Sequence, residues 1–127
     1  MVTGAFLAEA AATVDNKLNV QGGVLSKFVI GPDRLARFVL VVLTRPDAED
    51  SERRVDVEIR PPTLDEPISK WFEAPEAVVG EFPGFAFFGI DVTLPCDGRW
   101  VIDVTSGGEG VSLPLVVSTW KPEPLSI

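Results

Sequence analysis

The sequence contains no histidine and no tyrosine, and its single cysteine is Cys96. Without histidine, neither a Ser-His-Asp nor a Cys-His catalytic group can form, and zinc sites that combine histidine with cysteine are excluded as well. One cysteine cannot form a disulfide within the chain, which favours a reducing compartment over an oxidising one. We therefore expect a cytoplasmic protein that is not an enzyme and requires no cofactor.

Positive charge is also scarce. The chain has 11 lysines and arginines against 19 aspartates and glutamates, for a formal net charge of -8. Nucleic acids and anionic membrane surfaces are bound through clustered basic side chains, so we expect neither as a partner. The most hydrophobic run, Phe38 to Leu43, is far shorter than the roughly 20 residues of a membrane-spanning helix. No basic residue precedes Lys17, and Glu9 interrupts the early apolar residues, so no secretory signal is expected.

The sequence does contain repeated alternation of apolar and polar residues, which predicts strands with one buried face. Val55, Val57 and Ile59 alternate with charged residues in this way. The run Ala36 to Leu43 is apolar on both faces, which predicts a central strand covered on both sides. Pro114 cannot donate to a ladder, so its part of the last strand should lie at a sheet edge or a bulge. The expected strands lie within residues 6–14, 18–21, 24–30, 36–43, 53–60, 85–94, 99–105 and 110–120.

The alanine-rich segment Phe6 to Val14 fits the spacing of a helix as well as that of a strand. Turn residues follow it at 15–17, and residues 18–21 alternate again, which favours a strand that forms one arm of a hairpin. Gly22 and Gly23 would then mark a bulge or bend. The apolar face of this strand would consist of Phe6, Ala8, Ala10, Ala12 and Val14.

About eight short strands separated by glycine and proline are typical of an antiparallel sandwich or barrel. Residues 32–37 and 75–79 allow at most about one helical turn each. We therefore expect an all-β protein, a single antiparallel β-sandwich of about eight strands that is immunoglobulin-like in topology and spans residues 1–120. Residues 121–127, which include two prolines, should form an extended C-terminal tail.

Three short motifs stand near the two ends of the chain: LAEAA at residues 7–11, DNKLNVQGG at 15–23 and LPCDGRWVIDV at 94–104. They resemble the L-A-D-x-A, G-K-L-x-V-x-G-G and L-P-x-x-G-x-Y motifs of an uncharacterised family of small bacterial β-sandwich proteins. Glu9 replaces the aspartate of that family, and Trp100 stands where tyrosine is common. The resemblance implies a compact bacterial β-sandwich, and it implies no activity and no functional residue.

The aromatic residues are concentrated in the segment from Trp71 to Phe88, which holds six of the eleven phenylalanine and tryptophan residues of the chain. In an alternating strand, Phe85 and Phe87 should point away from the face that carries Phe88, so they are either exposed or covered by the Trp71 segment. Exposed apolar patches are typical of interfaces, whereas buried ones are ordinary core. We therefore expect a protein-interaction or assembly module that forms a homodimer or binds another protein. The candidate interface residues are Trp71, Phe72, Phe82, Phe85 and Phe87.

The acidic run Asp47 to Glu52 carries the alternative hypothesis, a small-ligand or calcium-binding β-sandwich that uses its acidic end loops. The run lacks the glycine and the carboxylate spacing of an EF-hand loop, so a solvated surface loop explains it as well. Cys96 has only Arg99 as a nearby cation and no base to activate it, which predicts a structural cysteine. Asp97 and Gly98 are typical turn residues between two strands.

Overall fold

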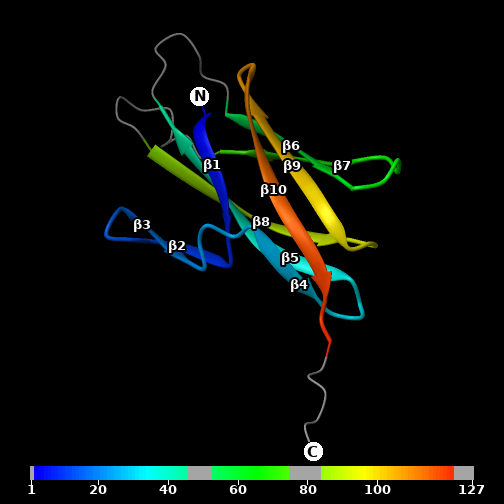
Figure 1. Cartoon of the computed structure of the whole chain (residues 1–127). Helices are drawn as coiled ribbons and strands as arrows, with labels where there is room; N and C mark the ends of the chain where they lie inside the picture. The colour runs from blue at the N-terminus through cyan, green and yellow to red at the C-terminus, as the bar shows by residue number, and fades with distance from the viewer. Residues whose placement is uncertain (1, 46–52, 75–83, 122–127) are drawn as a thin grey trace, which may run out of the picture.

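The computed structural model describes residues 2–45, 53–74 and 84–121 (Figure 1). In this part of the chain all regular elements are strands, and no helix is long and apolar enough to cross a membrane. An all-β protein was expected, and this is confirmed. The ten strands are β1 (Val2–Ala8), β2 (Ala10–Val14), β3 (Lys17–Gln21), β4 (Lys27–Ile30), β5 (Leu35–Thr44), β6 (Arg54–Arg60), β7 (Ile68–Glu73), β8 (Gly84–Thr93), β9 (Gly98–Ser106) and β10 (Glu109–Thr119).

The strands form a three-stranded sheet with the order β1-β5-β8, a five-stranded sheet with the order β4-β10-β9-β6-β7, and a separate β2-β3 hairpin. All pairs are antiparallel except β4 with β10, which is parallel and was not expected. The sheets are curled and together form a half-barrel, from which the β2-β3 hairpin projects (Figure 1). The sequence-based count of about eight strands is low because residues 6–14 are divided between β1 and β2, and because β7 was not predicted.

The hydrophobic core lies between the two larger sheets. Leu40 of β5, Ile90 of β8 and Ile102 of β9 are at most 1% exposed and belong to one cluster of buried side chains. Trp100 is also buried there, and its indole nitrogen donates to the carbonyl of Cys96 at 3.0 Å. Burial of this one continuous apolar cluster is the main stabilising contribution to the fold.

The opening segment is a strand, as predicted, but it breaks at Glu9. The amide of Glu9 donates to the carbonyl of Gln21 at 3.0 Å, so the chain leaves the three-stranded sheet there and enters the hairpin. Asp15 and Asn16 have φ values of 52° and 61°, which two-residue hairpin turns of type I′ require. The single apolar face predicted for this segment is wrong, since the change of sheet buries Leu7 and Ala8 together. Ala10, Ala12 and Val14 are exposed.

Strand β5 lies between β1 and β8 at the centre of its sheet, as expected. The expectation that both faces of this strand are covered holds only in part. On its outer face, Val41 is fully buried whereas Leu43 is 38% exposed. Pro114 pairs with Val101 of β9 on one side, and on its other side no described strand pairs with it, since β4 pairs with β10 only from Val116 to Thr119. This confirms the expectation for that proline. Residues 32–37 form a turn and the start of β5, while residues 75–79 and 122–127 lie outside the described part of the chain.

Candidate functional site

The candidate site lies where the two larger sheets meet along their free edges. In the described part of the chain, β7 pairs only with β6, and β8 pairs only with β5. The rings of Phe72 and Phe88 stack across this gap with centroids 4.8 Å apart and planes 14° apart. Both rings also pack against the core, so they hold the two edges together. We call the facing segments, residues 69–72 and 89–91, the rim.

A wide, shallow hollow of about 450 Å³ lies at the rim and is lined by Ser69, Lys70, Trp71, Phe72, Gly89 and Asp91. A Cβ atom placed at Gly89 would have no heavy atom within 4 Å, so the space in front of this exposed residue is open. The carboxylate of Asp91 is paired with Arg37 at 3.2 Å in an exposed ion pair. In the described residues, the rim therefore combines an accessible hollow with backbone groups of β7 and β8 that pair with no further strand, as extended peptides need for strand addition.

Trp71 is the most exposed aromatic residue of the rim, with 59% of its surface accessible. The guanidinium carbon of Arg54 lies 4.8 Å from the centre of its ring, and Arg54 also donates to Asp56 at 3.0 Å. A cation–π interaction of this kind at an exposed indole has a favourable energy of about 0.5–1 kcal/mol. The arginine thus orders the tryptophan on the outer surface of the five-stranded sheet, where its ring remains available to a partner.

The predicted interface residues do not form one patch. Trp71 lies on the outer face of β7, whereas Phe72 lies on the inner face and packs against Phe88. Phe85 and Phe87 lie on the other side of β8, opposite Leu43 and Val41, and both are half-buried. They point away from the core face that carries Phe88, as the alternation predicted. Phe82 is outside the described residues.

Lys70 and Gly89 line the hollow and were not predicted from the sequence. Lys70 is directly opposite the buried Val57 across the β6-β7 ladder, which places it on the inner face of β7. The alternation of Ile68, Lys70 and Phe72 with Ser69 and Trp71 was the signal that could have revealed this strand. No pattern in one sequence reveals that Gly89 would line this hollow.

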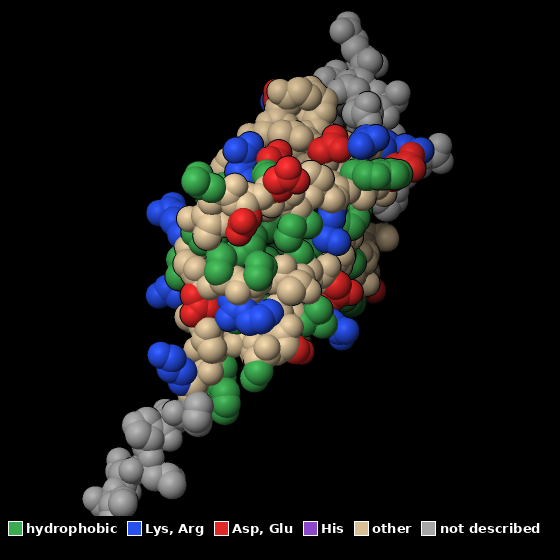
Figure 2. Space-filling view, turned by 90° about the vertical axis from the view of Figure 1, so that its right-hand side faces the viewer, with side chains coloured by type: hydrophobic (Ala, Val, Ile, Leu, Met, Phe, Trp, Pro, Cys, Tyr) green, Lys and Arg blue, Asp and Glu red, His purple; other side chains and the backbone are tan. Residues whose placement is uncertain are grey.

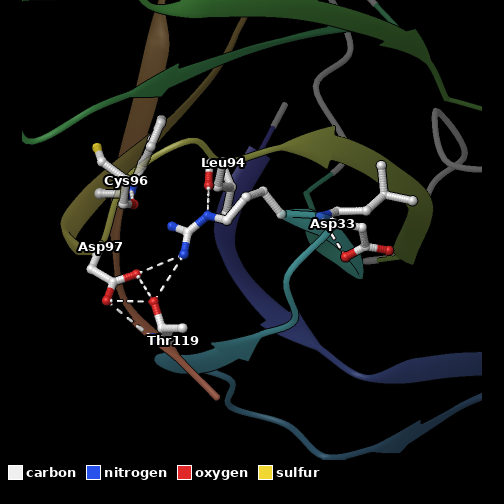
Figure 3. A network of polar contacts seen from close by, with 8 residues as sticks. Asp33, Leu94, Cys96, Asp97 and Thr119 are labelled. Atoms are coloured by element: carbon white, nitrogen blue, oxygen red, sulfur yellow. Dashed lines mark hydrogen bonds and ion pairs between the residues drawn. The ribbon is translucent and has the colours of Figure 1, made fainter. Parts of the chain in front are cut away.

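A second polar cluster surrounds Asp97, with Leu94 and Thr119 beside it (Figure 3), and Arg34 contacts all three. Arg34 donates to the carbonyl of Leu94 at 2.8 Å, to Asp97 at 2.9 Å and to the hydroxyl of Thr119 at 3.0 Å. The backbone amide of Thr119 donates to Asp97 at 3.1 Å. These contacts tie together the β4-β5 turn, the β8-β9 loop and the end of β10.

The contacts of this cluster stabilise the fold and do not form a catalytic site. The hydrogen bond from the Thr119 hydroxyl, and then that from Arg34, hold the pKa of Asp97 below its ordinary value. A carboxylate with a lowered pKa is a weak base, so it is poorly suited to accept a proton near neutral pH. The neighbouring Cys96 is half-buried and packs against the core. We therefore assign a structural role to the Arg34-Asp97 cluster.

Asp47 to Glu52, the acidic run considered for calcium, lies outside the described residues. In the described part, no group of three or more aspartate, glutamate or cysteine side chains is arranged to hold a metal ion. No protein-family model matches the chain, and no curated protein has significant sequence similarity to it. The motif resemblance to small bacterial β-sandwich proteins therefore stays a prediction.

Proposed function

We propose that this protein is a non-enzymatic protein-interaction module that receives an extended segment of a protein partner at the rim. The observation that carries the proposal is the pair of free edges, β7 and β8, which face each other across the hollow. An extended segment can satisfy the free backbone groups of an edge strand and place alternate side chains in flanking hollows. Trp71 and the open position at Gly89 would supply contact area and space for those side chains.

A second copy of the chain is one source of such a segment, so the proposal includes a homodimer. We further propose that the half-barrel is an open variant of an immunoglobulin-like sandwich, in a protein of the bacterial cytoplasm. The two facing sheets with a common core support the sandwich. The single cysteine and the absence of histidine support a reducing compartment and a non-enzymatic role.

Peptide selection tests this function. Peptides would be selected from a random displayed library on the immobilised protein and then titrated with wild type, Trp71→Ser, Gly89→Val and Leu64→Ser. Leu64 is fully exposed in the loop between β6 and β7 and is not part of the rim, so its variant is the matched control. We expect wild type and Leu64→Ser to bind equally and the two rim variants to lose binding. If the selected peptides bind Gly89→Val as tightly as wild type, the rim is not the docking site.

Sedimentation velocity separates the two sources of the segment. If a second copy occupies the rim, wild type forms a dimer whose fraction rises with concentration, and Gly89→Val is monomeric at the same concentrations. If the partner is another protein, both are monomeric and only peptide binding distinguishes them. Calcium binding remains the alternative hypothesis, and calorimetry with millimolar Ca²⁺ tests it, since the absence of heat would reject it.

A further inference from the structure

Lys70 occupies an unusual place for a charged residue. It lies on the inner face of an edge strand, between Ile68 and Phe72, which are both half-buried and pack against the core. Lys70 is itself half-buried and is one of the residues that line the hollow of the rim. Burial of a cationic group is unfavourable unless an acceptor or an anion compensates for the lost water.

The acidic side chains on the strands around Lys70 are already engaged by arginines. Asp91 pairs with Arg37 at 3.2 Å, and Glu73 pairs with Arg53 at 3.0 Å. On the neighbouring strands of the five-stranded sheet, the acids Asp56, Glu58 and Asp103 lie within 3.5 Å of Arg54 or Arg60.

Lys70 itself forms no ion pair with any residue of the described part. The rim therefore presents one unpaired, half-buried cation in a protein whose net charge is -8. Figure 2 shows that basic and acidic side chains are interspersed on the side of the molecule that it displays.

We propose that the segment bound at the rim carries a carboxylate side chain, and that Lys70 recognises it. This inference rests on the proposed function, because it names the chemistry of the segment that the rim receives. In an extended segment added along the edge, side chains on alternate positions point to the inner face, where Lys70 lies. A glutamate or aspartate at such a position would meet the ammonium group of the half-buried Lys70, where a charged hydrogen bond is stronger than between fully exposed groups.

Two synthetic heptapeptides test the inference. Both consist of alternating threonine and valine, are acetylated and amidated, and differ only at the central residue, which is glutamate in one and lysine in the other. Each is titrated by calorimetry into wild type, Lys70→Glu, Lys70→Met and Lys27→Glu. Lys27 is an exposed lysine on β4, at the opposite edge of the five-stranded sheet, so Lys27→Glu makes the same charge change away from the rim.

We expect wild type and Lys27→Glu to bind the glutamate peptide about fivefold more tightly than the lysine peptide. Lys70→Glu should reverse the preference, and Lys70→Met should abolish it, with both variants shown to be folded by circular dichroism. Equal binding of the two peptides by wild type would overturn the role of Lys70 and leave the proposed function standing. It would indicate that Lys70 only protects an edge strand from pairing, in which case Lys70→Met binds both peptides more tightly. Failure of wild type to bind either peptide at millimolar concentration would overturn the rim as a docking site as well.

Discussion

The ring of Phe72, on the last strand of the five-stranded sheet, stacks on the ring of Phe88, on the last strand of the three-stranded sheet, at a centroid distance of 4.8 Å. No backbone hydrogen bond joins β7 and β8 in the described part of the chain. Side-chain stacking therefore holds the two sheets together on this side, and the backbone edges stay free. This arrangement is what makes the rim both ordered and accessible.

Replacing Phe72 with alanine should destabilise the protein by about 2 kcal/mol, because it removes a half-buried ring and its stacking contact with Phe88. Trp71→Ala should cost about 1 kcal/mol or less, since that ring is exposed and loses mainly its contact with Arg54. Urea unfolding of both variants measures the difference. Equal losses would mean that the stack does not link the sheets.

Gly89→Val should leave the protein at least as stable as wild type, with a gain of about 0.5–1 kcal/mol, because a β-branched residue replaces a flexible one in open space. Gly110→Val is the control. There, a new Cβ would lie 3.0 Å from the methyl group of Thr105 and 3.3 Å from the carbonyl of Val104, so we expect a loss. Thermal unfolding of the two variants checks the contrast, and a destabilised Gly89→Val would show that the hollow is not open.

The pH dependence of stability should reveal Asp97. Its pKa is lowered in the folded protein, so its ionised form stabilises the fold above the unfolded pKa of about 3.9, and this stability is lost as the pH falls through the lower folded value. Urea midpoints of wild type and Asp97→Asn should differ at pH 5–7 and converge below about pH 4. The exposed pair of Asp91 makes Asp91→Asn a control with a small effect throughout. A gap for Asp97→Asn that persists unchanged to about pH 2 would contradict this assignment.

Arg34→Lys should cost about 1–2 kcal/mol, because one ammonium group cannot reach the carbonyl of Leu94 and the side chains of Asp97 and Thr119 together. The φ value of 58° at Arg34 is equally unfavourable for lysine, so the backbone contribution does not change. Arg37→Lys, in an exposed ion pair, should change the free energy of unfolding by less than about 0.5 kcal/mol. Similar unfolding midpoints for the two variants would argue against the cluster as a structural clamp.

The strands that follow strict local rules were predictable from the sequence. The alternation of Val55, Val57 and Ile59 predicted β6, and the Asp15-Asn16 turn predicted the β2-β3 hairpin. The break at Glu9 was not predictable, because it depends on which sheet each half of the segment joins. The parallel pairing of β4 with β10 is likewise a long-range event, fixed by packing between residues about 90 positions apart rather than by any local pattern.

The candidate site was predicted only in part. Aromatic clustering drew attention to Trp71 and Phe72, which do lie at the rim, and the alternation of β8 predicted that Phe85 and Phe87 point away from the face that carries Phe88. Lys70 and Gly89 can be identified as rim residues only once the edges of the two sheets are placed opposite each other. Such juxtapositions come from tertiary structure, which a single sequence does not display.

A nuclear magnetic resonance titration tests the central claim most directly. A peptide recovered by selection would be added to the isotopically labelled protein, and the shifts of backbone amides would be followed along the chain. We predict that the largest shifts fall on residues 69–72 and 89–91, with little change at the other exposed apolar residues, Val29, Val116 and Trp120. Shifts centred on those three residues, with the rim unchanged, would contradict the account.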